Sequence, residues 1–308
     1  MSFADSSETT LSIVPEAGWG LTPATPAFLN ARFTSESLAY NIETTDSDEI
    51  RPDAEISDLI QVGAGAAGDL NFELSYDPTL QLIMAAALRG TWTADVLKAS
   101  IVKPSFTIEK KFETGASDQY HRFPGIRFGT FNLGIQAKQK ITGTAGTMGK
   151  GAVSGTVPVT GATYAAAGTN PVMAAPDVAT IEVGGIAVPL YFTDLSIALT
   201  NNLRAQGAIG SIDNVGIGYG RRETTVNMTA YFENGALYDQ FVAGAPTSLG
   251  YTVSDGANSY EILFPKLKYT QGTVVAGGNN QDIMVQAVAR ALVDPTEGTS
   301  LKITRVPA

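Results

Sequence analysis

Apolar and polar residues alternate along much of the chain with a period of two. The alternation is clearest from Phe131 to Ile141, where one set of alternate positions is mainly apolar and the other mainly polar. Successive side chains of a β-strand point to opposite faces, so this pattern predicts a strand with one buried face. Similar patterns, bounded by Gly, Asn and Asp, predict strands at Leu70–Tyr76, Ser105–Phe112, Thr224–Tyr231, Tyr260–Tyr269 and Ile283–Leu292. We therefore expect a mainly β fold.

Two segments have helical spacing instead. In Pro78–Leu88 the apolar residues recur at the spacing of one helix face, Asp77 and Pro78 fit an N-cap and a first helical position, and Gly90 lies just past the last turn. Gly235–Ala243 has a shorter pattern of the same kind. Each predicted helix follows a predicted strand directly.

The order of predicted elements occurs twice. Phe33–Ala39 matches Phe192–Ala198 in residue type at five of seven positions, at an offset of 159 residues. Leu70–Phe72 lies 156 residues before Val226–Met228, and both segments lead toward a predicted helix. The pattern favours a duplicated module, and chance similarity between short β-rich segments is the alternative.

These observations divide the chain into four parts. We expect an N-terminal arm at residues 1–30, a first module at 31–149, a linker or arm at 150–177 and a second module at 178–308. The segment 150–177 consists mainly of Gly, Ala, Thr, Val and Pro with almost no charge, which is typical of a linker or a long surface arm.

Composition and charge exclude several kinds of site. Cysteine is absent from the 308 residues, which removes disulfides, thiolate nucleophiles and zinc–thiolate sites. The net charge of −10 disfavours tight binding to phosphates, although an acidic wall suits a channel through which DNA must slide. The acidic, Ser/Thr-rich N-terminus lacks the features of a secretory signal, and no apolar run is long enough for a membrane helix. We expect no export and no membrane partner.

No motif predicts catalysis or a cofactor. Gly63–Gly68 matches the glycine spacing of a dinucleotide-binding loop, but the residues that follow predict a strand where that loop requires a helix. A Gly-rich β-turn is the better interpretation, and Gly216–Gly220 occupies the equivalent place in the second module. The single histidine, His121, lacks the neighbours of a catalytic triad or metal site, and Trp19 and Trp92 are expected to pack. We predict no enzyme activity, no cofactor and no metal.

One segment is strongly acidic. Its spacing does not fit a calcium loop, because no glycine stands at the sixth position after Asp46. A solvated loop and a contact loop between subunits are the two interpretations, and Arg221 and Arg222 are candidate partners on a neighbouring subunit. The acidic contact candidates are Glu43, Asp46, Asp48, Glu49, Asp53, Glu55 and Asp58.

Several segments resemble a family of tail tube proteins from long-tailed bacteriophages and prophages. The resemblance extends from about residue 56 to residue 151 and includes residues 200–232. The segments that carry it are Glu55–Tyr76, Ala87–Trp92, Ser105–Phe112 and Ile141–Gly151.

The resemblance implies a β-sandwich or barrel module flanked by one helix, with inner strands of neighbouring subunits joined around a channel. Two modules in one chain would give a trimeric ring with pseudo-sixfold symmetry, and a single module a hexamer. Stacking would use the acidic loop, the segment 150–177 and the N-terminal arm. The expected partners are other copies, tail terminator, tape measure and distal tail proteins, and DNA that passes without specific binding. The expected location is the virion tail, after synthesis in the host cytoplasm.

Three other classes stay open on the sequence alone. A porin of the outer membrane shares the Gly-rich, acidic, cysteine-free β composition, although the missing signal peptide and the two helices speak against it. A tail-associated decoration protein or adhesin differs from a tube protein by failing to polymerise. An enzyme is the third class, and the chain lacks a nucleophile, metal or cofactor constellation.

Overall fold

The structure is a computed structural model that describes residues 3–115, 117–186 and 190–308. It confirms a mainly β fold, and the described part contains two α-helices, α1 (Pro78–Leu88) and α2 (Ala236–Ala243), and two short 3-10 helices (Ser6–Glu8 and Ala175–Asp177). The strands are β1 (Thr10–Pro15), β2 (Ala27–Asn30), β3 (Ser35–Glu36), β4 (Ala39–Asp46), β5 (Leu59–Glu73), β6 (Val96–Lys98), β7 (Phe106–Phe112), β8 (Gln119–Gln136), β9 (Thr142–Gly149), β10 (Val153–Gly155), β11 (Thr163–Ala165), β12 (Val178–Val183), β13 (Phe192–Thr200), β14 (Arg204–Gln206), β15 (Gly216–Gly218), β16 (Glu223–Tyr231), β17 (Thr247–Ser254), β18 (Ser259–Val275), β19 (Met284–Ala291) and β20 (Lys302–Val306).

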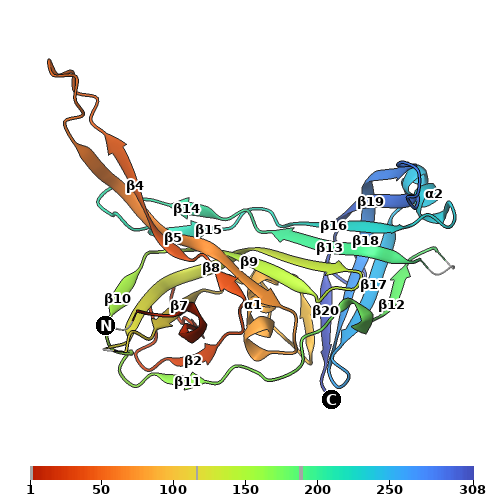
Figure 1. Ribbon diagram of the computed structural model, residues 1–308, viewed down its shortest axis with the longest axis horizontal. Helices are drawn as coiled ribbons and strands as arrows, with labels where there is room; N and C mark the ends of the chain where they lie inside the picture. The colour runs from red at the N-terminus through yellow and green to blue at the C-terminus, as the bar shows by residue number, and fades with distance from the viewer. Residues whose placement is uncertain (1–2, 116, 187–189) are drawn as a thin grey trace.

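A central antiparallel sheet runs through both parts of the chain (Figure 1). Its strand order is β4–β5–β9–β8–β13–β16–β19–β18, and β3 continues the β4 edge beside β5. The junction between the first half (31–149) and the second half (178–308) is the pairing of β8 with β13, from Gln136 opposite Asp194 to Thr130 opposite Thr200. Strands predicted separately near residues 70, 131, 224 and 283 therefore lie in one sheet.

The two halves have the same order of strands. The first half reads β4–β5–β9–β8–β7, and the second reads β13–β16–β19–β18–β17. In each half one long strand takes part in two pairings: the start of β8 pairs with β7 and its end with β9, just as the start of β18 pairs with β17 and its end with β19. Each helix follows the second strand of this order.

Buried side chains from both halves form one continuous core. Alternation decides which face is buried: in β16, Val226, Met228 and Ala230 are buried while the residues between them are partly exposed. Strands β1 and β2 extend the β7 side of the first half, where Leu11 and Ile13 join the core. Burial of this apolar surface is the main contribution to stability.

Helix α1 begins and ends for clear local reasons. The carboxylate of Asp77 accepts hydrogen bonds from the backbone N–H groups of Thr79 (2.9 Å) and Leu80 (3.2 Å), and Pro78 stands at the first helical position. Both features were predicted. The left-handed residue that ends the helix is Arg89, with φ of 53°, rather than Gly90. Helix α2 begins after Gly235 and ends at Gly244.

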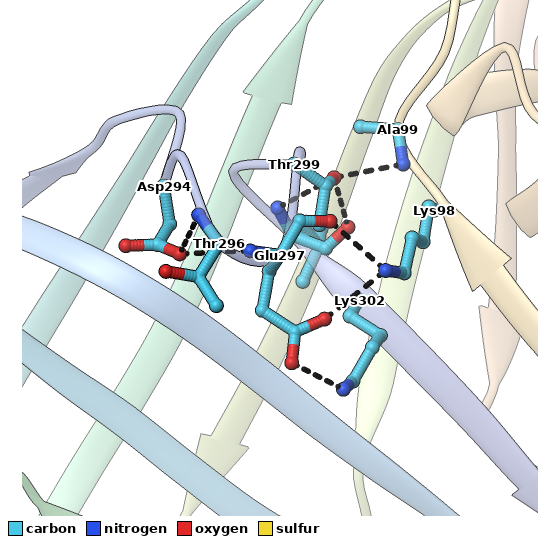
Figure 2. A network of polar contacts seen from close by, with 8 residues as sticks. Lys98, Ala99, Asp294, Thr296, Glu297, Thr299 and Lys302 are labelled. Carbon is cyan, nitrogen blue, oxygen red and sulfur yellow. Dashed lines mark hydrogen bonds and ion pairs between the residues drawn. The ribbon is translucent and has the colours of Figure 1, made fainter.

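The C-terminal strand fastens the second half to the first. Strand β20 pairs with β18 and with β6, and a polar network lies beside this contact (Figure 2). Lys98 Nζ and Lys302 Nζ both bind the Glu297 carboxylate, at 3.1 and 3.0 Å, and Asp294 accepts the backbone N–H of Glu297 at 2.9 Å. The hydrogen bonds from Lys302 and Lys98 hold the pKa of Glu297 below its ordinary value.

Two local predictions are wrong. The segment Gly63–Gly68 was expected to be a turn, but it lies within the continuous strand β5. Gly68 has a φ of 156° and lies against the backbone of Ser37 and Leu38, so a side chain there would collide with main-chain atoms. The strand predicted from Phe131 to Ile141 ends at Gln136, because the chain turns at Lys138 with a positive φ before β9 begins.

The segments predicted as arms pack against their own chain. Residues 1–30 contain β1 and β2, which pair with each other, and β1 also pairs with β7. Within residues 150–177, β10 pairs with β8, β11 pairs with β2, and the Met173 side chain is fully buried. Tyr164 stacks on Phe28 with ring centroids 5.3 Å apart. Apolar side chains at these few positions hold an otherwise polar or small-residue segment to the body.

We expect Asp77→Ala to lower the free energy of unfolding by about 2 kcal/mol. The change removes the N-cap of α1 and also the acceptor of the Gly168 backbone N–H, which lies 2.8 Å from the carboxylate. Chemical denaturation monitored by circular dichroism measures the loss. The matched control is Asp5→Ala, which removes the exposed cap of a short 3-10 helix and should leave the free energy of unfolding unchanged within the error of the measurement. Equal effects of the two changes would contradict the assignment.

Candidate assembly interface

One face of the central sheet is polar and open to solvent. The paired residues along one row across the sheet show its character, since all of them are partly or fully exposed. That row consists of Asn71, Thr144, Asn132, Ala198, Thr225, Arg290 and Lys268. Small polar groups bond to each other across neighbouring strands: Thr144 donates to Asn71 at 2.6 Å, and Asn227 donates to Ser196 at 3.2 Å. The face is therefore a regular surface of short hydrogen-bonding side chains.

Charges on this face are few and mixed. Glu223 pairs with Arg290 at 3.4 Å, and Lys140 pairs with Glu73 at the end of β5. Charged side chains in paired positions along these strands are Asp69, Glu73, Asp194, Glu223, Lys268 and Arg290. The face has no continuous basic surface that could grip a polyanion by counterion release.

The strands β4 and β5 form a long hairpin that extends beyond the body of the molecule (Figure 1). It brings all seven predicted acidic residues onto one projection, from Glu43 on β4 to Asp58 just before β5. Arg51 forms an ion pair with Asp53 at 2.7 Å, and this hydrogen bond lowers the pKa of Asp53. Ile50 near the tip is 98% exposed, and every residue of β4 is exposed. In a single chain this hairpin has no packing partner over most of its length.

The second half has a shorter hairpin at the equivalent place, and it takes a different course. Strands β14 and β15 pair with each other, and the loop between them crosses β5, where the Ala64 N–H donates to the Ile212 carbonyl at 2.8 Å. Asn214 also donates to the Gly149 carbonyl, at 3.2 Å. This hairpin therefore binds the first half at β5, and the part of the β4–β5 hairpin beyond this contact projects from the body.

The two predicted arginines have different environments. Arg222 is partly buried and donates to the carbonyls of Leu88 and Ser100, each at 2.6 Å. Burial, and then the nearby charge of Arg89, lower the pKa of Arg222 to about 10. Arg221 pairs with Glu223 at 2.5 Å while its side chain stays 79% exposed. Within the described residues neither arginine contacts the acidic hairpin, so their predicted pairing with it stays a prediction about neighbouring copies.

The other residues considered from the sequence have structural surroundings. His121 is exposed and lies edge-on to Phe112, with ring centroids 5.2 Å apart. The Trp19 and Trp92 indoles donate to the carbonyls of Gly125 and Gln81. Among the described residues, no group of three or more His, Asp or Glu side chains is placed to hold a metal ion. In the same part of the chain, neither helix is long and apolar enough to span a membrane.

Sequence reasoning missed two features of this surface. It identified alternating strands but did not reveal that their polar positions combine into one open face, because strand order is set by long-range pairing. It also missed that large apolar side chains stay exposed where the sheet ends at β18 and α2. These are Tyr231, Phe232, Tyr238, Val242, Val275 and Ile283.

A protein-family model described as phage tail tube protein matches residues 6–291. The chain belongs to the phage tail tube protein family. No curated protein matches the sequence. The match spans both halves of the central sheet, so the protein is a structural tail tube protein, and the family's place is the virion tail.

We expect Arg222→Ala to destabilise the fold by about 2 kcal/mol, because two carbonyls near the end of α1 lose charged donors. The matched change Arg221→Ala should alter stability by less than about 0.5 kcal/mol, since it breaks only an exposed ion pair. Thermal unfolding of the unassembled protein measures both. A larger loss from Arg221→Ala than from Arg222→Ala would contradict the placement of these side chains.

Proposed function

We propose that copies of this chain form rings that stack into the phage tail tube, through which the genome passes into the host. The observation that carries the proposal is the one-sided central sheet of a tail tube family member: one face covers the core and the other presents mainly polar side chains, many of them short and bonded to each other. A sheet of this kind can form the wall of a channel if neighbouring copies extend it.

The polar face is the proposed lining of the channel. DNA slides best along a wall without strong attraction, because bound cations would hold its phosphates in place. Several hydroxyl and amide groups of Thr, Asn and Ser on this face already bond to each other. They therefore leave fewer free donors that could bind DNA. The net charge of −10 also disfavours adhesion to the wall.

The two halves are proposed to be duplicated modules, with residues 31–149 and 178–308 as their approximate extents. Their identical strand order supports the duplication. A ring of three such chains would have six similar modules around its axis. The N-terminal residues 1–30 and the segment 150–177 would then support the first module from outside the central sheet.

The β4–β5 hairpin is the proposed contact between stacked rings. It is the longest projection from the body, and its tip combines carboxylates with exposed apolar residues (Figure 1). Docking on a copy in the next ring would bury Ile50 and Ile56 and bring the acidic residues near cations such as Arg221. Tail terminator, tape measure and distal tail proteins are the proposed partners at the ends and inside the tube. Synthesis in the host cytoplasm is part of the same proposal.

We expect replacement of residues 48–57 by Asn-Gly to leave the fold and the rings intact and to abolish stacking. The tip lies outside the core, and Asn-Gly suits a tight turn between antiparallel strands. Electron microscopy of the purified protein over a concentration series should show hollow tubes for the natural chain and single rings for the shortened one.

The control is the double variant Arg51→Ala with Asp53→Ala, which keeps the net charge and the hairpin length and should still form tubes. Tubes from the shortened chain would refute the role of the hairpin. A natural chain that stays monomeric at every concentration would refute the proposed function itself.

A further inference from the structure

The central sheet ends in two open edges. The end of β18, from Tyr269 to Val275, pairs with β19 on one side, and no described strand pairs with its other side. At the opposite end, β3 and β4 pair with β5, and again no described strand lies beyond them. Neither edge has a strand partner for its outward backbone N–H and C=O groups, which natural sheets cover or pair. At Leu38 the Glu36 carboxylate accepts the N–H at 2.8 Å and the Lys110 ammonium donates to the carbonyl, so a pairing strand would have to displace these two side chains.

The chain itself contains a template for pairing these edges. Asn71 lies opposite Ser35, and Asn227 lies opposite Ser196, so Ser35 in the first half corresponds to Ser196 in the second. The correspondence holds further along these strands, since Ala39 lies opposite Ala67 and Thr200 opposite Glu223. Equivalent residues of this strand in the two halves are thus 161 positions apart, two more than the 159 of the sequence match. Since side chains alternate with a period of two, both offsets place equivalent residues on the same face of the sheet.

The other strand of the template can be aligned in the same way. Thr144 is paired with Asn71 and Asn132, and Val288 is paired with Asn227 and Gln271. Gln271 on β18 therefore corresponds to Asn132 on β8. Inside the chain, Asn132 lies opposite Ala198 on β13, and Ala198 corresponds to Ser37.

We propose that the ring closes by antiparallel pairing of β18 with β3 and β4 of the next copy, with Gln271 opposite Ser37 and Thr273 opposite Ser35. This inference rests on the proposed function, because it requires copies to form a ring. It specifies the partner as a second copy of this chain and gives the register residue by residue.

The proposed register matches buried positions with buried positions. Because β18 has a bulge at Thr270, Tyr269 rather than Thr270 comes opposite Leu38 in this register. Both side chains are buried on the core side, as are Phe131 and Leu199, the equivalent pair inside the chain. Ser35 and Ser37 are exposed on the polar face, as are Gln271 and Thr273. A shift by one residue would place polar side chains in the core and apolar ones on the polar face, so the burial pattern disfavours it.

The helices give an independent reason to place a partner at the β18 edge. Helix α1 is buried on most sides, and part of its cover comes from the second half: Asn201 donates to the Ala87 carbonyl at 2.8 Å, and Gln81 donates to Tyr260 at 3.3 Å. Only Leu237 of α2 is buried, although Phe241 packs tightly on Gly272 of β18. Side chains of the second half pack and bond against α1, and no described segment makes the equivalent contacts with α2.

Both sides of the proposed contact have suitable surfaces. On α2, the apolar side chains of Val242 and Tyr238 are 65% and 39% exposed, which leaves an apolar surface without cover at this end of the sheet. Along the β3 edge of the same chain runs a groove of about 850 Å³, lined by residues 4–7, 33–36 and others including Phe112. In a ring, the groove of one copy would lie next to the α2 end of its neighbour.

Cysteine cross-linking tests the register directly, because the natural chain has no cysteine. Tubes of the double variant Ser37→Cys with Gln271→Cys should, after oxidation, give covalent oligomers up to a closed trimer on a non-reducing denaturing gel. The matched control is Asn132→Cys with Ala198→Cys, the same pair within the chain, which should form its disulfide without linking copies. The shifted pair Ser37→Cys with Thr273→Cys should cross-link at least about tenfold less, because its Cβ atoms lie too far apart.

Two results would overturn the register and leave the proposed function standing, provided that tubes form normally. In the first, the shifted pair cross-links better than the proposed pair. In the second, neither pair cross-links copies although the internal control forms its disulfide. Hydrogen exchange of natural tubes covers the case in which a cysteine variant does not assemble. Amides at 33–39 and 269–275 should gain at least about tenfold protection on assembly, while those at 130–136 and 194–200 are protected in both states. Unchanged exchange at either edge, or failure of the natural chain to assemble, overturns the inference.

Discussion

The unsatisfied backbone at the two edges of the central sheet is the constraint on which the rest of this structure depends. The inner strands of the body have a neighbour on each side, whereas the outermost described strands, and the part of β5 that lies in the projecting hairpin, pair on one side alone. Water can satisfy those groups in a monomer, but an exposed edge also pairs with any available strand. A closed ring removes both edges at once, which explains why a chain with so large a one-sided sheet is suited to assembly.

The same constraint explains how the two halves differ. Inside the chain, the β14–β15 hairpin of the second half binds β5 and Gly149 of the first, and Asn201, just past the junction of β8 with β13, binds the end of α1. At the two ends of the sheet, the matching elements have less cover within the described residues: Leu237 alone is buried in α2, and the β4–β5 hairpin projects from the body. In the proposed duplication, one hairpin would hold the two halves together and the other would reach a neighbouring copy.

Much of the fold was predictable from local patterns. Alternation identified β7, β16 and β19 within one or two residues, and the Asp77–Pro78 pair fixed the start of α1 because capping is a local interaction. The glycines of β5 were misread because the reason for Gly68 lies in the backbone of Leu38, thirty positions away. The acidic contact candidates lie close together in the sequence, and the structure places them on one hairpin. The partly buried environment of Arg222 depends on contacts with Leu88 and Ser100, which are distant in sequence, so it could not be predicted.

Cryo-electron microscopy of the natural tube, at a resolution that shows side chains, would reveal whether the polar face of the eight-stranded sheet lines the channel. We expect Asn71, Asn132 and Thr225 to point toward the tube axis, with α1, β1 and β2 on the outside of the wall. A map in which these three side chains are buried between subunits or face the outer surface, with another part of the chain lining the channel, would contradict this expectation.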